Sequence, residues 1–369
     1  MYDSIVIGGG QAGLAAGYHL QRRGLKFTIL EANSDAIGSW GHYYQSLKLF
    51  SPARYSSLPG MRFPGDPSRY PSRDEVIAYF QHYRAHFNLP VITSTRVEQI
   101  TQSNGIFHLT TNNGEFQARS LIAATGAFNR PYLPELPGQA AFGGEILHSS
   151  AYFEPTPLKD KRVIVVGAGN SAVQIAVELA QSADVTLTSR EPIAFRQQRP
   201  WGLDIHFWIT ITGYDTFSLP AFLRQPQVND SVNANPQILD TGVYQAALAA
   251  GKPAWQPMFS QFTPDGVVWA DGRAEQVDAV IFATGYRPNV PYLASTGALD
   301  AEQRPIHLNG ISAIVPGLYY VGLSFQRSHA SATIRGVGAD ANYVIKHLQH
   351  YLKHAPILST PKAQIAVNS

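Results

Sequence analysis

A glycine-rich loop close to the N-terminus joins a short apolar strand to a helix. Residues 4–7 (Ser-Ile-Val-Ile) predict the strand, and the helix-compatible residues 14–23 follow the loop. Between them, Gly8, Gly10 and Gly13 have the spacing G-x-G-x-x-G. This spacing lets the backbone approach a pyrophosphate at the positive end of the helix. The segment therefore predicts the first unit of a dinucleotide-binding fold.

The same order of elements occurs again near the middle of the chain. Residues 162–166 predict a strand and residues 173–181 predict a helix. The loop between them contains Gly167 and Gly169, and Ala172 stands in the place of the third glycine. Alanine is allowed there where the position serves only the close packing of helix against strand. A second nucleotide-binding unit is therefore expected.

The two copies agree in register over a long distance. Each is followed by an Ala-Thr-Gly triplet that closes an apolar run. The same 116 residues separate Gly10 from Gly126 in the first copy and Gly169 from Gly285 in the second. Chance is a poor explanation for this agreement, so the chain contains a duplicated architecture.

The expected fold class is α/β, with two dinucleotide-binding Rossmann-like domains, the second inserted in the first. The first domain is discontinuous and covers residues 1–155 and 286–369, and the second covers residues 156–285. Residues from about 200 to 257 break the strand-helix order and predict a helical excursion. This excursion either has a small core of its own or forms part of a substrate pocket or lid. Residues 355–369 are polar and predict a flexible tail.

A returning strand and a long helix are expected near the C-terminus. The strand is predicted over residues 318–322, and the helix runs from Ala332 to Leu352 with Ser331 as its N-cap. The N-terminus of this helix would lie beside the first nucleotide site. Its dipole either stabilises negative charge on a bound cofactor or only closes the domain.

Two residues at matching positions indicate which dinucleotide each unit binds. Glu31 lies 18 residues after Gly13, and Arg190 lies 18 residues after Ala172. A carboxylate accepts hydrogen bonds from a ribose diol and repels a 2′-phosphate, whereas a guanidinium binds a 2′-phosphate. The first site therefore predicts FAD and the second predicts NADPH. Because Glu191 is adjacent and weakens phosphate binding, use of NADH stays open.

Composition excludes several other classes of protein. None of the 369 residues is Cys, which excludes disulfides, thiolate metal sites, iron-sulfur clusters and a dithiol centre of the thioredoxin-reductase type. The net charge of +2 gives no field that favours nucleic acid or an anionic membrane. His82 and His86 lie at i and i+4 of a predicted helix, but no third ligand is evident, so no metal site is predicted. No signal-peptide pattern or run of about 18 apolar residues occurs, which favours a cytoplasmic protein without a membrane span.

These motifs resemble those of the flavin-containing monooxygenases, in a compact bacterial form related to the Baeyer-Villiger monooxygenases. The resemblance includes residues 142–152, which match the family pattern F-x-G-x-x-x-H-x-x-x-(Y/F). It also includes Gly38-Ser39-Trp40, which is similar to a flavin-side element of the family. The Baeyer-Villiger branch usually ends the longer pattern in Trp followed by Pro or Asp. Tyr152 and Phe153 stand here instead, which favours the branch that oxygenates heteroatoms.

The glycine motifs and the resemblance together assign residues to each cofactor. The residues expected at FAD are Gly8, Gly10, Gln11, Ala12, Gly13, Glu31, Ala32, Gly38, Trp40, Val97, Ala124, Thr125, Gly126, Ala332 and Ile334. The residues expected at NADPH or NADH are Gly167, Gly169, Asn170, Ser171, Arg190, Ala283, Thr284 and Gly285. No catalytic side chain is assigned, because the chemistry takes place on FAD. The resemblance implies that His148 and Tyr152 help to fix the relative position of the two domains.

The activity that the resemblance implies is oxygenation. NADPH reduces FAD, oxygen adds to the flavin at C4a, and the hydroperoxide transfers one oxygen to a soft nucleophile such as a sulfide or an amine. The family has an asparagine near the flavin, and where it is expected this chain has Leu49-Phe50-Ser51-Pro52. Baeyer-Villiger oxygenation, an NAD(P)H oxidase or flavin reductase activity, and a non-catalytic flavin-binding role therefore stay open. The expected partners are a small-molecule substrate and oxygen, and a homodimer through the flavin domain is a further expectation.

Overall fold

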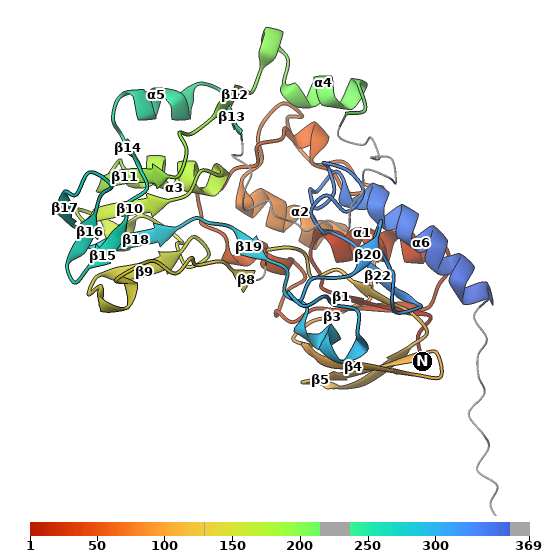
Figure 1. Cartoon of the computed structure of the whole chain (residues 1–369). Coiled ribbons are helices and arrows are strands. Elements are labelled where there is room, and N and C mark those ends of the chain that lie inside the picture. The colour runs from red at the N-terminus through yellow and green to blue at the C-terminus, as the bar shows by residue number, and fades with distance from the viewer. Residues whose placement is uncertain (129, 215–236, 355–369) are drawn as a thin grey trace, which may run out of the picture.

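The computed structural model describes residues 1–128, 130–214 and 237–354, which form an α/β fold around two largely parallel sheets (Figure 1). The first sheet has the strand order β20-β21-β22-β7-β1-β2-β3, and its strands from β22 to β3 are parallel. The strands are β1 (Ser4–Ile7), β2 (Phe27–Leu30), β3 (Val91–Ile92), β7 (Leu121–Ala123), β20 (His307–Leu308), β21 (Ile311–Ser312) and β22 (Leu318–Tyr320).

Burial on both faces explains why β1 and β2 are continuous apolar runs. On one face, Val6 packs in the same core as helices α1 (Gln11–Gln21) and α6 (Val337–His354). On the other face, Ile5 and Ile7 pack against a small antiparallel sheet. Successive residues of β1 therefore stabilise two different layers, and the loop after the strand is held from both sides.

The second sheet has the strand order β14-β11-β10-β18-β9 and is parallel throughout. Its strands are β9 (Glu145–His148), β10 (Arg162–Val166), β11 (Asp184–Ser189), β14 (Ala254–Pro257) and β18 (Ala279–Phe282). Helix α3 (Asn170–Leu179) packs against one face of this sheet, to which β10 contributes Val163 and Val165. The opposite face, which includes Ile164 and Val166, packs against aromatic residues such as Phe262 and Trp269.

Two edge strands of this sheet differ from the sequence-based expectation. Strand β9 pairs with β18, with Glu145 opposite Ala279, although a boundary at residue 155 assigns this strand to the first domain. No glycine loop or α-helix lies between β9 and β10, so the sequence of β9 does not mark it as part of a βαβ unit. Strand β14 pairs with β11, so the excursion over residues 200–257 returns to the sheet and is not only helical.

The excursion contains two short helices in the part of the chain that is described, α4 (Ile205–Ile211) and α5 (Val243–Ala249). It also contains β13 (Ile238–Asp240), which pairs with β12 (Phe195–Gln197). Residues 215–236 lie outside the described residues. The separate small core and the pocket or lid therefore both stay predictions for this excursion.

Three further small sheets and several 3-10 helices complete the described chain. The antiparallel sheets are formed by β4 (Val97–Ser103), β5 (Ile106–Thr111) and β6 (Gly114–Ala118), and by β15 (Gln261–Thr263), β16 (Gly266–Val268) and β17 (Ala274–Gln276). A two-stranded ribbon joins β8 (Arg130–Pro131) to β19 (Tyr286–Arg287), so the two segments that pass between the large sheets lie side by side (Figure 1). The 3-10 helices are η1 (Gly38–His42), η2 (Ala53–Tyr55), η3 (Gln139–Ala141), η4 (Thr156–Leu158), η5 (Pro200–Gly202) and η7 (Pro291–Thr296).

Helix α2 (Arg73–His86) begins with a reciprocal capping box, which explains its sharp N-terminal boundary. The side chain of Ser72 accepts a hydrogen bond from the Glu75 amide, and the Glu75 carboxylate accepts one from the Ser72 amide at 2.8 Å. Aromatic side chains such as Tyr79 and Tyr83 bury one face of the helix in the first core.

Helix α6 begins later than its sequence pattern predicts. The helix starts at Val337, whereas Ala332 has a left-handed φ of +62° and belongs to a loop. The Ser331 hydroxyl does not cap the helix, because it accepts the amides of Arg327 at 3.0 Å and Ser328 at 3.1 Å. The predicted start at Ala332 is therefore wrong. Its apolar spacing suits a helix, but the hydrogen bonds of this loop hold the backbone in a different conformation.

None of the described helices is both long enough and apolar enough to cross a lipid bilayer. The predicted tail, residues 355–369, lies outside the described residues.

Two partly buried histidines are expected to make stability depend on pH. Burial lowers the pKa of His19 to about 4 and that of His307 to about 4. Because the unfolded chain binds these protons near pH 6.5, stability should fall as the pH decreases from about 6.5 to about 4. Replacing His307 by Asn keeps an acceptor for the Gly310 amide and removes one titrating group. Urea unfolding of His307→Asn at pH 7 and pH 5 should show a smaller loss of stability than the parent shows. The exposed His82→Asn control should lose as much as the parent, and an equal loss in His307→Asn would contradict the assignment.

Candidate functional site

Both glycine loops open into one cavity of about 1110 Å³. The loops that follow β1, β2 and β7 contribute to it from the first sheet, and the loops that follow β10 and β18 contribute from the second. All of these loops lie at the carboxyl ends of parallel strands, which is where ligands bind in open α/β folds.

Most of the residues predicted to hold cofactors line this cavity. From the first set these are Gly8, Gly10, Gln11, Ala12, Glu31, Ala32, Gly38, Trp40, Val97, Ala124, Thr125, Gly126, Ala332 and Ile334. From the second set these are Gly169, Asn170, Ser171, Ala283 and Gly285. The structure therefore brings together residues more than 320 positions apart in the sequence.

The first glycine loop is too tightly folded to carry side chains. Gly8 has a φ of +106°, and a Cβ on it would lie 2.7 Å from the Ala124 carbonyl oxygen. A Cβ on Gly13 would lie 1.8 Å from the Gly8 carbonyl oxygen, which is far inside van der Waals contact. Gly10 and Gly38 also meet, because a Cβ on Gly38 would lie 2.8 Å from the Gly10 Cα. The cavity therefore has a floor of bare backbone, which suits the close approach of a pyrophosphate.

Glu31 is held by the backbone at the end of β2. Its side chain is buried, with 4% of the residue exposed. The Gly9 amide donates to Oε2 at 2.6 Å, and the Asn33 amide donates to Oε1 at 2.8 Å. A carboxylate accepts about four hydrogen bonds. Glu31 can therefore accept two more from a ribose diol while the two amides keep it oriented.

Gln11 connects two other predicted cofactor residues from distant parts of the chain. Its Nε2 donates to the carbonyl oxygen of Ala332, and its Oε1 accepts from the Trp40 indole at 3.2 Å. The first residue of α1, the 3-10 helix η1 and the loop before α6 are thus joined by one amide side chain. This network holds the Ala332 loop against the first glycine loop.

The second glycine loop is more open than the first. Gly167 has a φ of +147°, and a Cβ on it would lie 2.5 Å from the Ala283 carbonyl oxygen, so glycine is needed there. A Cβ on Gly169 would meet no atom within 4 Å. Ala172 is fully buried in the first turn of α3, and its Cβ lies 3.1 Å from the Cβ position of Gly167. The helix lies farther from the loop than α1 does, which explains why alanine replaces glycine here.

Four predicted residues do not line the cavity. Gly13 and Gly167 instead allow the helix and strand to approach each other. Thr284 donates its hydroxyl to the carbonyl oxygen of Tyr132, which is a structural contact. Arg190 is exposed directly after the end of β11.

His148 is a neutral structural histidine at the end of β9. The Ser150 amide donates to its Nδ1 at 3.1 Å, so Nε2 carries the proton and donates to the Gly285 carbonyl oxygen at 3.0 Å. Burial lowers the pKa of His148. The residue therefore ties β9 to the loop after β18, beside the cavity-lining Gly285.

Tyr152 lies beside α3 and beside the segment that contains Tyr44. Its hydroxyl donates to Glu178 of α3 at 2.7 Å. Tyr44 packs against its ring, with 6.2 Å between centroids, and donates to Gln174 of α3 at 2.9 Å. These contacts are of the kind that would fix the two units relative to each other, and that role stays a prediction.

Aromatic residues that sequence reasoning did not assign also line the cavity, among them Tyr43, Tyr286, Tyr292 and Phe325. Burial raises the pKa of Tyr43 to about 12 and also raises that of Tyr286, so both phenols stay neutral near pH 7. Tyr43 packs edge-on against Trp40 with 5.4 Å between ring centroids. Its position three residues after the predicted Trp40 could have identified it from the sequence. Phe325 lies in a loop without a motif and gave no such signal.

His82 and His86 lie on α2 with 6.0 Å between ring centroids. Within residues 1–128, 130–214 and 237–354, no three His, Asp or Glu side chains gather in a way that could hold a metal ion.

The two glycine loops should respond differently to a matched pair of substitutions. Gly13→Ala forces a methyl group into the Gly8 carbonyl and should lower the free energy of unfolding by about 3 kcal/mol or more. Ala172→Gly at the equivalent position of α3 should cost about 1 kcal/mol, the usual helix penalty of glycine. Chemical denaturation measures both, and equal losses would contradict the difference in helix position.

Comparison with known proteins gives a consistent result. A family model described as pyridine nucleotide-disulphide oxidoreductase matches residues 5–210. A relative from Geobacillus kaustophilus, described as an uncharacterized oxidoreductase CzcO-like, is 35% identical and covers 95% of this chain and 99% of its own. The indole-3-pyruvate monooxygenase YUCCA1 of Oryza sativa subsp. japonica is 29% identical, over 94% of this chain and 91% of its own.

A solved structure agrees over nearly the whole chain. The flavin-containing monooxygenase from Stenotrophomonas maltophilia is 33% identical, with a TM-score of 0.82, and covers 95% of this chain and 98% of its own. The chain therefore belongs to the flavin-containing monooxygenase family of oxidoreductases.

Proposed function

We propose that this chain is an FAD-dependent monooxygenase that uses NADPH in preference to NADH and oxygenates sulfides or amines. The observation that carries the proposal is that two glycine loops, each at the start of a helix, line the same 1110 Å³ cavity. Two dinucleotides bound to these loops would have their reactive rings in a shared space. We also propose that the two units are separate dinucleotide-binding domains, the second inserted in the first.

The first glycine loop and its neighbours fit FAD. The bare backbone of Gly8, Gly10 and Gly38 leaves room for a pyrophosphate that a Cβ would fill. Glu31 would accept the hydrogen bonds of the adenosine ribose. The Ala332 loop, held by Gln11, would lie along the ring end of the cofactor.

The second loop fits the pyrophosphate of NADPH. Helix α3 begins at Asn170 without a side-chain cap, so the amides of its first turn and the positive end of its dipole suit an anion. Asn170 and Ser171 line the cavity at this end. Arg190, exposed after β11, would bind the 2′-phosphate, with the adjacent Glu191 limiting the preference.

The proposed reaction converts a sulfide, O₂, NADPH and a proton into a sulfoxide, water and NADP⁺. FAD supplies the electron transfer from NADPH and the activation of oxygen. The chain contributes orientation and a dry site, since water favours loss of the oxidant as hydrogen peroxide. Trp40, Leu49 and Tyr286 are among the apolar and aromatic side chains that line the cavity for this purpose.

One observation favours a second candidate, an NAD(P)H oxidase that releases peroxide. Leu49, Phe50 and Ser51 line the cavity where the family asparagine is expected. The Ser51 hydroxyl lies 2.8 Å from that of Ser56, so it is already engaged in a local contact. No side-chain amide is therefore supplied by this segment. The rice relative is named for a 2-oxo acid, so ketones also belong in the test of substrates.

Product analysis separates these candidates. The protein is incubated with NADPH, oxygen and panels of sulfides, amines and ketones, and NADPH consumption is compared with oxygenated product and hydrogen peroxide. The proposal expects sulfoxide or N-oxide to account for most of the NADPH consumed. Peroxide equal to NADPH with every substrate would establish the oxidase instead, and esters from ketones would establish Baeyer-Villiger chemistry.

Arg190→Ala tests the assignment of the coenzyme. Loss of a charge-assisted contact to the 2′-phosphate should reduce kcat/KM for NADPH by about 10- to 100-fold and leave kcat/KM for NADH nearly unchanged. Steady-state kinetics with both coenzymes measures this change, and the exposed Arg22→Ala variant at the end of α1 is the control. A parent enzyme with a clear advantage for NADH would overturn the preference.

A further inference from the structure

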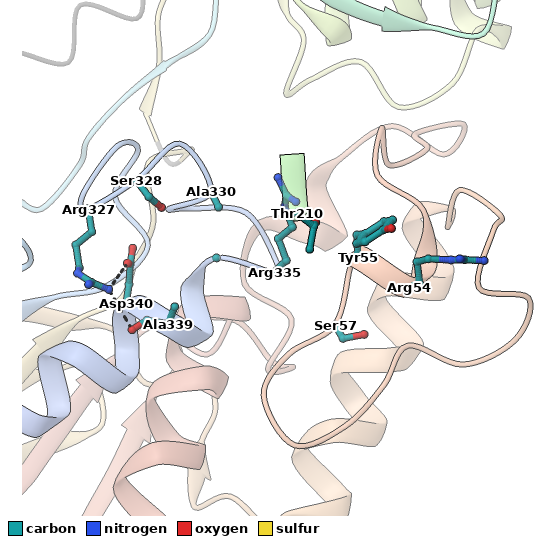
Figure 2. A pocket seen from close by; sticks show the side chains of 11 residues that line it. Arg54, Tyr55, Ser57, Thr210, Arg327, Ser328, Ala330, Arg335, Ala339 and Asp340 are labelled. Carbon is teal, nitrogen blue, oxygen red and sulfur yellow. Dashed lines mark hydrogen bonds and ion pairs between the residues drawn. The ribbon is translucent and has the colours of Figure 1, made fainter. Parts of the chain in front are cut away.

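A second, smaller cavity of about 260 Å³ lies beside the Ala332 loop (Figure 2). Three separate segments form it: η2 with the residues after it, helix α4, and the loop that leads into α6. Figure 2 shows Tyr55 of η2 and Arg335 of the α6 loop on neighbouring walls, with Arg335 extending toward Thr210 of α4.

The walls of this cavity carry more positive than negative charge. Arg54, Arg327 and Arg335 line it, and Asp340 is the single acidic residue among its lining residues. Arg327 and Asp340 form an ion pair at 3.3 Å (Figure 2). Arg54 donates to the Ser68 hydroxyl at 2.7 Å. Because three guanidinium groups and only one carboxylate belong to the residues that line it, an anion is the ligand that this cavity favours.

Two polar features at the start of α6 add to this preference. Gly336 and Ala339 line the cavity, so the positive end of the 18-residue helix is directed toward it. Asp340 is 2% exposed, and its Oδ2 has no hydrogen-bond partner among the residues that the structure describes. Burial raises the pKa of Asp340, so this carboxyl opposes a bound anion less than an exposed carboxylate would.

Arg335 lines both the smaller cavity and the large one. The loop between them is thin and tightly folded, since a Cβ on Gly336 would lie 1.8 Å from the Ala330 carbonyl oxygen. Thr333 and Ile334 of the same loop line the large cavity, whereas Ala330 and Gly336 line the small one. A molecule with its reactive atom in the large cavity can therefore be recognised at its far end by Arg335.

We propose that the smaller cavity binds the carboxylate of the substrate. Arg335 would then make the enzyme selective for carboxylic acids that carry a thioether or an amine over the uncharged analogues of these acids. This inference rests on the proposed oxygenation of soft nucleophiles. The Tyr55 ring and the backbone of the α6 loop would contact the chain that joins the carboxylate to the reacting atom.

The test uses methylthioalkanoates of increasing chain length, each paired with its uncharged primary amide. The parent holoenzyme should show a kcat/KM at least about tenfold higher for the acid than for the amide at the best chain length, the size of one charge-assisted contact. Arg335→Met keeps a long side chain but removes the positive charge, so it should bring the acid-to-amide ratio of kcat/KM close to one. Arg335→Lys should restore part of the ratio. Arg22→Met should keep the parent ratio, because Arg22 is exposed at the far end of α1.

Calorimetric titration of the oxidised holoenzyme with the same acids gives a readout that needs no turnover. Acid binding that is weakened by Arg335→Met supports the subsite even if no sulfide is oxygenated, in which case only the proposed reaction fails. Equal binding of acid and amide to the parent, or an acid-to-amide ratio unchanged in Arg335→Met, would overturn the subsite. Acetate that binds as tightly as the best acid would show a site for free small anions and would also overturn it.

Discussion

The contact between the first turn of α1 and the loop before it determines the geometry of the whole site. Gly13 lies so close to the Gly8 carbonyl that no side chain can be placed between them. This approach brings the unpaired amides of the helix to the bottom of the cavity and leaves the Gly9 amide to orient Glu31. The second unit repeats the arrangement with a looser fit, since Ala172 is accommodated where the first unit needs glycine. The same strand-loop-helix arrangement therefore occurs twice, with the carboxylate of Glu31 near the first loop and the guanidinium of Arg190 at the matching position of the second unit.

The cavity exists because the two units face each other, and a small set of contacts connects them. The ribbon of β8 and β19 pairs the two connecting segments. Tyr44 reaches α3 through Gln174, and Tyr152 packs against Tyr44 and bonds to Glu178. Within the first unit, Gln11 joins α1 to the Ala332 loop. The cofactor loops are thus set by local backbone chemistry, and we expect the space between them to depend on contacts of this kind.

Sequence reasoning predicted the elements whose signals are local. The strands at residues 4–7 and 162–166 are confirmed residue for residue, because each is a buried apolar run before a turn. It missed β9 and β14, since short edge strands depend on the partner that the fold brings to them. It placed the start of α6 at Ala332, because hydrogen bonds of the Ser331 loop are not visible in apolar spacing. The glycine-loop residues of the site were predictable from spacing, but Phe325 and Arg335 come from loops without periodicity and needed the structure.

If the two glycine loops bring a flavin and a nicotinamide together in one cavity, electrons should pass from NADPH to FAD within this chain. Anaerobic mixing of the purified protein with NADPH, followed through the visible absorbance of the flavin, tests it most directly. We expect a yellow protein with bound FAD that is bleached by NADPH at a rate that saturates with NADPH concentration. A protein that takes up no FAD, or one whose bound FAD stays oxidised in the presence of NADPH and NADH, would contradict it.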